Sequence, residues 1–196
     1  MSISVPAARE TSLHFPAGSL VILTGLPGAG KTTLLRRLYG LTGTESGPVT
    51  AGGAAVIDSM QSRLHWAGGL RWAPKPVRTF VVFCTHLWRI RAAVRAGRSV
   101  VAHNRGCGAF VLRAFAWMGR RGGFHLVLLD VTPEVAKAGQ HARGRVVPDR
   151  TFARHHRRCH ALLARARAGR PAPAHSARIL DRAEADLLES IRFGRP

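Results

Sequence analysis

The stretch SLVILTGLPGAGKTTLL, residues 19–35, decides the fold of this chain. Residues 19–24 are apolar enough for a buried strand, and residues 31–41 carry leucines at helical spacing. Between them, residues 25–32 match the pattern Gly-x-x-x-x-Gly-Lys-Thr of a phosphate-binding loop without a mismatch. A strand, a glycine-rich loop and a helix in this register predict a site for a nucleoside triphosphate.

Each residue type in the loop suits phosphate binding. Glycines let the backbone turn sharply, so that successive N–H groups point at phosphate oxygens, and the positive end of the following helix adds attraction. We expect the Lys31 ammonium to reach the β- and γ-phosphates and the Thr32 hydroxyl to bind Mg²⁺. ATP is preferred over GTP, because the chain has no Asn-Lys-x-Asp string for reading guanine. The predicted nucleotide-binding residues are Gly25, Leu26, Pro27, Gly28, Ala29, Gly30, Lys31, Thr32 and Thr33.

Beyond the loop, short β-like apolar runs alternate with longer helical patterns, which is typical of an α/β domain with a mostly parallel sheet. Further strands are expected at residues 54–57, 99–102, 124–129 and 178–180. Helices are expected at residues 77–96, 109–120, 149–168 and 181–191, with another starting at Pro133. Residues 42–53 and 66–76, rich in Gly and Pro, are expected to be irregular.

The composition favours one domain in the cytoplasm. At 196 residues and 46% hydrophobic, the chain suits a single packed domain spanning residues 1–196. Its apolar runs are too short to cross a bilayer, and residues 1–10 lack the pattern of a signal peptide. Three widely spaced cysteines fit reduced thiols better than a disulfide framework. No membrane partner is expected.

The charge balance leaves two interpretations open. Thirty Lys and Arg against ten Asp and Glu give a formal net charge of +20. Such a field attracts phosphates and nucleic acid, which indicates an anionic partner. The alternative is coding bias, because only three basic residues are lysines and the arginines are spread along an Ala- and Gly-rich chain.

The tryptophans divide into two groups. Trp88 and Trp117 fall within helical apolar patterns and are expected in the core, although exposed tryptophans can also form a stacking platform for bases. Trp66 and Trp72 lie in the irregular segment after Asp58, where we expect the acceptor pocket.

A cluster of histidines and a cysteine marks the helix expected at residues 149–168. His156 and His160 share one helix face, and His155 and Cys159 share another, so the two pairs point in different directions. The neighbouring arginines would also repel a metal cation. A solvated basic helix is therefore favoured over a metal site. The cluster consists of His155, His156, Cys159 and His160.

The loop GLPGAGKTT in a compact chain resembles the P-loop kinase group, and more narrowly the zeta-toxin-like and polynucleotide-kinase-like P-loop NTPases. The resemblance covers residues 20 to about 188. It implies a three-layer α/β P-loop NTPase fold with a five-stranded, mostly parallel sheet flanked by helices, and a lid at about residues 139–168. It also implies transfer of the γ-phosphoryl of ATP to a hydroxyl. Its weaker parts are residues 56–58, 96–104, 125–134 and 141–155.

Four residues acquire roles from this resemblance. Asp58 resembles the carboxylate that orients the acceptor hydroxyl, although a lone Asp at a strand end is equally often a cap. Asp130 follows four apolar residues, as in the Walker B pattern, and would hold Mg²⁺ through water. Arg143 and Arg145 resemble lid arginines that close on the phosphates. Lys31, Asp58, Arg143 and Arg145 are thus the predicted catalytic residues.

Two departures from the family pattern concern catalysis and the acceptor. The third strand of these kinases commonly ends in an aspartate, where this chain has Ala102-His103-Asn104. A lid arginine is commonly found where this chain has Gly139-Gln140. The predicted function is a kinase acting on a small-molecule or nucleotide hydroxyl. The alternatives are a nucleic-acid end kinase and a nucleotide-dependent switch without an acceptor.

Overall fold

The computed structural model describes residues 11–104, 108–144 and 146–194. Within this part of the chain, six strands form the main sheet in the order β3-β4-β5-β2-β6-β7. Neighbouring strands pair in parallel throughout, except that β3 pairs antiparallel with β4 at one edge. The strands are β2 (Leu20–Gly25), β3 (Val49–Ala51), β4 (Ala54–Ile57), β5 (Ser99–His103), β6 (Phe124–Leu129) and β7 (Ser176–Leu180). The predicted mostly parallel sheet is confirmed.

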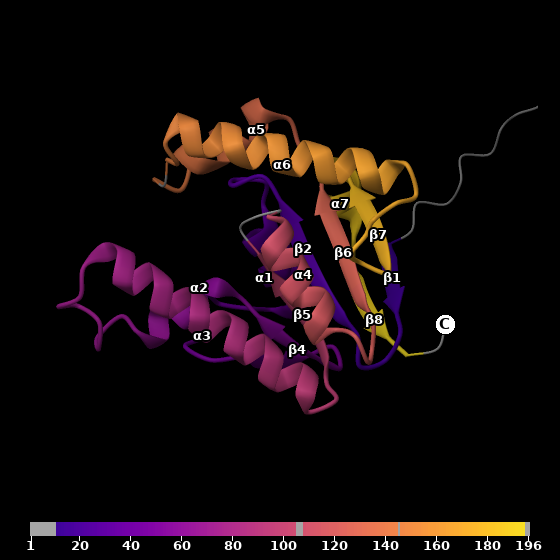
Figure 1. Cartoon of the computed structure of the whole chain (residues 1–196), viewed down its shortest axis with the longest axis horizontal. Coiled ribbons are helices and arrows are strands. Elements are labelled where there is room, and N and C mark those ends of the chain that lie inside the picture. Colours follow the sequence, from indigo (N-terminus) through magenta and orange to yellow (C-terminus); the bar gives the residue numbers. More distant parts are fainter. Residues whose placement is uncertain (1–10, 105–107, 145, 195–196) are drawn as a thin grey trace, which may run out of the picture.

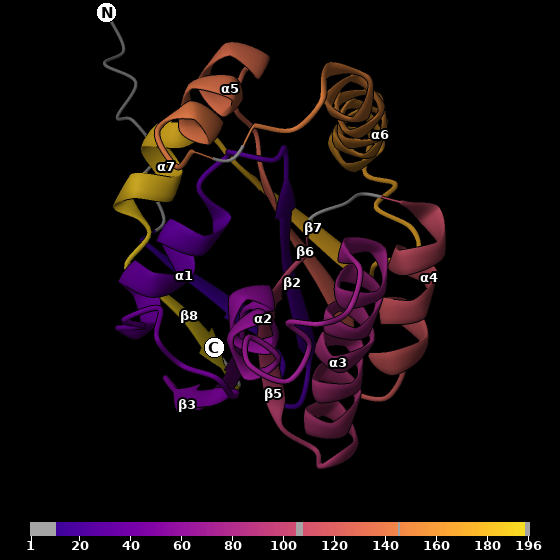
Figure 2. The same ribbon diagram turned by 90° about the vertical axis from the view of Figure 1, so that its left-hand side faces the viewer.

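The helices flank this sheet and cover one end of it. Figure 2 shows α1 on one side of the strands, with α3 and α4 on the other. Figure 1 shows α6 crossing the end to which β6 and β7 point, with α5 beside it. The helices are α1 (Lys31–Tyr39), α2 (Ser59–His65), α3 (Lys75–Arg95), α4 (Ala109–Met118), α5 (Pro133–His141), α6 (Asp149–Arg167) and α7 (Arg182–Leu187).

The central strands explain how the site is assembled. Every residue of β2 and β6 is buried, as expected for continuous apolar runs in a parallel sheet that is covered on both faces. The carboxyl ends of parallel strands share one edge, and ligands of open α/β sheets bind outside that edge. The loop after β2, Asp58 after β4 and His103 at the end of β5 therefore lie at the same edge.

The sequence-based prediction of five strands missed β3. Residues 49–56 form a hairpin in which Val49 pairs with Val56. Gly52 and Gly53 form its turn with φ of 57° and 73°, a left-handed conformation that favours glycine and suits a tight hairpin. The glycines and the proline of residues 42–53 predict an irregular segment, and a strand of only three residues carries too short an apolar pattern to outweigh them.

The closing helix expected at residues 181–191 is also shorter than predicted. It ends at Leu187, and the chain continues as β8 (Ser190–Phe193), which pairs in parallel with β1 (Ser12–Phe15). Ile191 of β8 and both Leu13 and Phe15 of β1 are buried. Burial of these alternating apolar side chains favours a strand over continuation of the helix.

The prediction that Trp88 and Trp117 lie in the core is wrong. Their exposed fractions are 66% and 49%. Toward the sheet, α3 buries Arg89 and Ile90 instead of Trp88. The Arg89 guanidinium tolerates burial because it donates to the Ser46 carbonyl at 2.8 Å.

No helix in the described ranges is long and apolar enough to cross a membrane. Cys84 and Cys159 are free thiols, exposed and buried respectively, and Cys107 lies outside the described residues.

The packing of α1 against the sheet gives a test of the fold. Leu35 of α1 is fully buried, whereas Leu187 of α7 is 44% exposed. Leu35→Ala should lower the free energy of unfolding by about 2–5 kcal/mol, because it leaves a cavity in the core. Leu187→Ala, the matched control, should change it by less than about 1 kcal/mol. Denaturant unfolding measures both, and equal effects would contradict the described packing of α1.

Candidate nucleotide-binding site

The loop between β2 and α1 is held in a curled conformation by its own lysine. The Lys31 ammonium donates to the carbonyls of Gly25 at 2.9 Å and Leu26 at 2.7 Å. Gly28 and Gly30 have φ of 96° and 93°, backbone angles that residues with a side chain rarely adopt. Lys31 is only 6% exposed, so its charge is kept at a fixed position beneath the loop.

A cavity of about 610 Å³ opens beside this loop, within the size range of small-molecule sites. It lies between the loop, the carboxyl ends of β4 and β5, and the segment from α5 to α6. Its lining residues are Pro27, Gly28, Gly30, Lys31, Thr32, Thr33, Arg36, Asp58, Ser59, Met60, His103, Gly139, Gln140, Arg143, Val147, Thr151 and His155. Six of the nine predicted nucleotide-binding residues thus line the cavity, whereas Gly25, Leu26 and Ala29 are buried and do not line it.

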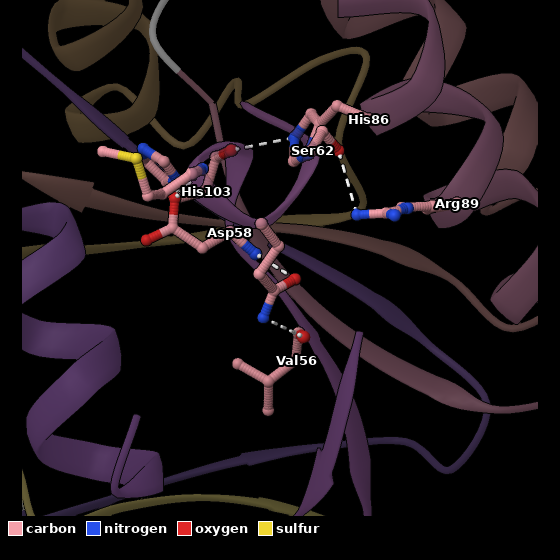
Figure 3. Close-up of polar contacts among 8 residues, drawn as sticks. Val56, Asp58, Ser62, His86, Arg89 and His103 are labelled. Carbon is pink, nitrogen blue, oxygen red and sulfur yellow. Dashed lines mark hydrogen bonds and ion pairs between the residues drawn. The ribbon is translucent and has the colours of Figure 1, made fainter. Parts of the chain in front are cut away.

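Asp58 and His103 form a buried pair on the wall of this cavity. The Asp58 Oδ1 atom lies 3.2 Å from His103 Nδ1, and each side chain is 5% exposed. Figure 3 shows the two side chains pointing toward each other from the ends of neighbouring strands. Asp58 also accepts the Met60 amide at 2.8 Å and is the N-cap of α2. Asp58 therefore caps α2 and also lines the cavity, and its role toward an acceptor hydroxyl stays a prediction.

The environment of Asp58 stabilises its ionised form. Burial alone raises its pKa, but contact with His103, the Met60 amide and the charge of His86 outweigh burial and lower the pKa to about 2. Asp58 is consequently a carboxylate at any physiological pH. A group with so low a pKa accepts a hydrogen bond readily but is a weak proton acceptor.

A second layer of hydrogen bonds holds the pair in place. His86 Nε2 lies 3.1 Å from the His103 carbonyl, and Figure 3 draws this contact as a dashed line. Gln61 accepts the Asp58 amide at 3.1 Å through Oε1 and donates to the Val56 carbonyl at 3.3 Å. These contacts tie α2 and α3 to the ends of the strands, so the Asp58 carboxylate is positioned by several elements at once.

Gly139 and Gln140, at the start of the segment predicted to be a lid, pack directly on the loop. A Cβ at Gly139 would overlap the Gly28 carbonyl oxygen, and a Cβ at Gly28 would overlap that of Ala136. Gln140 donates to the Pro27 carbonyl at 3.0 Å and accepts the Val147 amide at 2.8 Å. At Gly139-Gln140, where the chain departs from the family pattern, the glycine therefore allows α5 to approach the loop closely and the glutamine hydrogen-bonds to it.

The lid arginines are only partly described. Arg143 lines the cavity and donates to the Thr33 hydroxyl at 2.6 Å, whereas Arg145 lies outside the described residues. His155 of α6 also lines the cavity. Burial lowers the pKa of His155, and the positive charges of two flanking arginines and of Lys31 lower it further. This imidazole is therefore neutral near pH 7.

Asp130 lies apart from the cavity. It follows β6 and forms an ion pair with Arg167 near the end of α6. It is not among the residues that line the cavity beside Lys31. Among the described residues that line the cavity, Asp58 is the acidic one.

Several lining residues were not predicted from the sequence. Arg36 faces the cavity one turn beyond Thr32, a position that helical spacing could have indicated. Thr151 and Met60 carry no motif and depend on how the lid and α2 fold over the loop. Trp66 and Trp72 do not line the cavity, although the acceptor pocket was expected beside them.

Metal-binding clusters are absent from the described part of the chain, where no group of three or more His, Cys, Asp or Glu side chains could hold a metal ion. His156 and His160 stack loosely at 6.2 Å between ring centroids, while Cys159 is buried.

A family described as ABC transporter matches residues 8–82, a minority of the chain that contains the loop. The phosphonates import ATP-binding protein PhnC of Trichormus variabilis is 46% identical over 55 residues, which are 28% of this chain and 22% of that protein. The aligned part spans about a quarter or less of the import proteins that it matches. These matches support an ATP-binding P-loop protein.

Most of the chain, by contrast, matches the fold of other solved proteins, a gluconokinase among them. A gluconokinase from Sinorhizobium meliloti 1021 matches with a TM-score of 0.52 and 13% identity, over 88% of this chain and 89% of that one. A chain of the PezAT toxin-antitoxin system of Streptococcus pneumoniae matches with a TM-score of 0.54 and 16% identity, over 95% and 81%. The protein has an α/β P-loop NTPase-like fold.

The contact between α5 and the loop gives a second test. Gly139→Ala should push α5 away from Gly28, lowering stability by about 1–3 kcal/mol and weakening nucleotide binding. Gly68→Ala is the matched control, because its Cβ would meet nothing within 4 Å. Thermal unfolding and titration with a fluorescent ATP analogue measure both effects. Equal behaviour of the two variants would show that α5 does not pack on the loop.

Proposed function

We propose that this protein is a kinase that transfers the γ-phosphoryl of ATP to a hydroxyl of a small molecule or nucleotide. The observation that carries the proposal is the ionised Asp58 carboxylate, which lines the same cavity as Lys31 and Thr32. A phosphate-binding loop facing a fixed carboxylate across one cavity provides a donor end and an acceptor end. The kinases that share the fold over most of the chain support the proposal by analogy.

At the donor end, the loop holds the triphosphate. The amide groups at the start of α1 and the Lys31 ammonium bind the phosphate oxygens. The Thr32 hydroxyl, which lines the cavity, is a hard oxygen ligand of the kind that Mg²⁺ prefers. Bound Mg²⁺ would neutralise phosphate charge. Asp130 pairs with Arg167 and does not line the cavity, so its binding of Mg²⁺ through water stays a prediction.

At the acceptor end, Asp58 orients the hydroxyl. Phosphoryl transfer passes through a loose transition state, so catalysis depends mainly on positioning and on charge stabilisation. A carboxylate with a pKa of about 2 suits this task, since it stays ionised and accepts the hydroxyl hydrogen bond. His103 and the Met60 amide both contact the Oδ1 atom of Asp58 and so hold the carboxylate in place.

Positive charge surrounds the transferred group. Arg36 and Arg143 line the cavity with Lys31, so three cationic groups face the position expected for the phosphates. We propose that Arg143, which contacts Thr33 beside the loop, stabilises the charge that develops as the γ-phosphoryl leaves. Arg145 belongs to the same proposal. Closure of the α5–α6 segment would exclude water and limit hydrolysis.

A second candidate is a nucleotide-dependent switch that hydrolyses ATP slowly and has no acceptor. It is favoured by the local match to import ATP-binding proteins over the loop. The switch is also favoured by His103 at the end of β5, where similar kinases commonly have an aspartate. Acceptor-stimulated formation of ADP separates the two candidates.

Two variants should separate ATP binding from phosphoryl transfer at this site. Lys31→Ala should weaken ATP binding by about tenfold or more, because it removes a charge-assisted contact with the phosphates. Asp58→Asn should keep ATP affinity within about threefold and lower acceptor-dependent ADP formation by about 10²-fold, because the acceptor hydroxyl loses the group that orients it. Calorimetric titration with ATP and Mg²⁺ and a coupled ADP assay measure these quantities.

Lys137→Ala and Asp186→Asn serve as controls, because they make the same chemical changes at exposed positions. Both should leave ATP binding and ADP formation unchanged. Full acceptor-dependent turnover in Asp58→Asn would remove this carboxylate from the mechanism.

A further inference from the structure

A second hollow lies at the opposite end of the sheet from the phosphate-binding loop. It has a volume of about 360 Å³ and lies where the carboxyl ends of α3 and α4 meet the starts of the central strands. Figure 2 shows these helix ends at the lower side of the molecule, with α5 and α6 at the upper side. The lining residues are Gly18, Arg91, Val94, Arg95, Gly97, Trp117, Met118, Arg120, Arg121 and Gly122.

The hollow concentrates positive charge. Four of its residues are arginines, all exposed, and none is acidic. Among the described residues, none of these four guanidinium groups has an ion-pair or hydrogen-bond partner; they are Arg91, Arg95, Arg120 and Arg121. The surrounding sequence offers no neutralisation either, because no Asp or Glu occurs between Asp58 and Asp130. Like charges held this close repel one another, and a bound anion would relieve that repulsion.

An exposed aromatic ring stands among these arginines. The Arg91 guanidinium carbon lies 4.8 Å from the centre of the Trp117 ring, and that of Arg120 lies 5.6 Å from it. Trp117 is 49% exposed, so part of its ring stays open to a ligand. Exposed aromatic rings among arginines are the combination on which single-stranded nucleic acids stack their bases and place their phosphates.

The same combination continues along both helices beyond the hollow. Trp88 lies one turn before Arg91 on α3 and is 66% exposed. Arg113 lies one turn before Trp117 on α4 and is also exposed. A strip of alternating arginine and tryptophan suits a polymer with repeated phosphates better than a single nucleotide.

We propose that the arginine–tryptophan hollow, formed by Arg91, Arg95, Trp117, Arg120 and Arg121, binds single-stranded nucleic acid. Phosphates lie against the guanidinium groups, and a base stacks on Trp117. A lipid bilayer fits this surface less well, because inserting Trp117 would also bury the guanidinium group of Arg91.

This site is separate from the nucleotide-binding cavity. The hollow borders the residues before β2, and the loop follows β2, whose six residues span about 20 Å. The proposal therefore does not rest on the kinase function. It places a tether for nucleic acid away from the site of phosphoryl transfer.

The test measures binding of fluorescent single-stranded RNA and DNA of about 12 nucleotides to the full chain by anisotropy at several salt concentrations. Arg120→Ala/Arg121→Ala should lower affinity about tenfold. It should also reduce the slope of the logarithm of the binding constant against the logarithm of the salt concentration by about 1–2 in magnitude. Trp117→Ala should lower affinity about fivefold or more, while Trp117→Phe should retain most of it. Thermal unfolding checks that each variant is folded.

Three controls make the result specific. Arg170→Ala/Arg192→Ala removes the same charge at exposed positions elsewhere and should change affinity less than about twofold. Lys31→Ala should bind oligonucleotides normally, and Arg120→Ala/Arg121→Ala should bind ATP normally. Equal losses in the two double-arginine variants, loss of binding in Lys31→Ala, or tighter binding of anionic lipid vesicles than of oligonucleotides would each overturn the proposal.

Discussion

The two hydrogen bonds from the Lys31 ammonium to the carbonyls of Gly25 and Leu26 connect the fold to its function. Gly25 ends the central strand and Lys31 begins α1, so the contact closes the loop between them. A buried ammonium requires polar partners, and the curled loop supplies them before any phosphate arrives. The loop, its charge and the start of α1 are therefore already arranged for a triphosphate.

The carboxylate on the opposite wall depends on a different balance of forces. Burial opposes the charge of Asp58, and the protein offsets that cost with His103 and the Met60 amide. Because β4 and β5 end side by side, Asp58 and His103 converge although they are far apart in sequence. The local match to import ATP-binding proteins ends at residue 82, before His103 and the lid. The fold of the rest of the chain therefore decides how this cavity is built.

The sequence predicted those parts of the fold that local patterns control. The loop, the strands at residues 54–57 and 124–129 and the long helices appear with boundaries shifted by a few residues at most. It failed where tertiary pairing decides the structure: β3 is three residues long, and β8 exists because Ile191 packs beside β1. Asp58 was named from its place at a strand end, but its pairing with His103 and the fit of Gly139 against Gly28 depend on chain segments that only the fold brings together. Trp88 was misplaced because its apolar spacing did not reveal that α3 buries Arg89 instead.

The most direct measurement follows the γ-phosphoryl group itself. ATP labelled at the γ-phosphorus, with Mg²⁺, is incubated with the protein and a panel of nucleosides, sugars, antibiotics and 5′-hydroxyl oligonucleotides, and the products are separated. We expect label on one class of acceptor, at a rate well above its release as inorganic phosphate. Label that appears only as inorganic phosphate, at a rate that no acceptor changes, would contradict a kinase and favour a nucleotide-dependent switch.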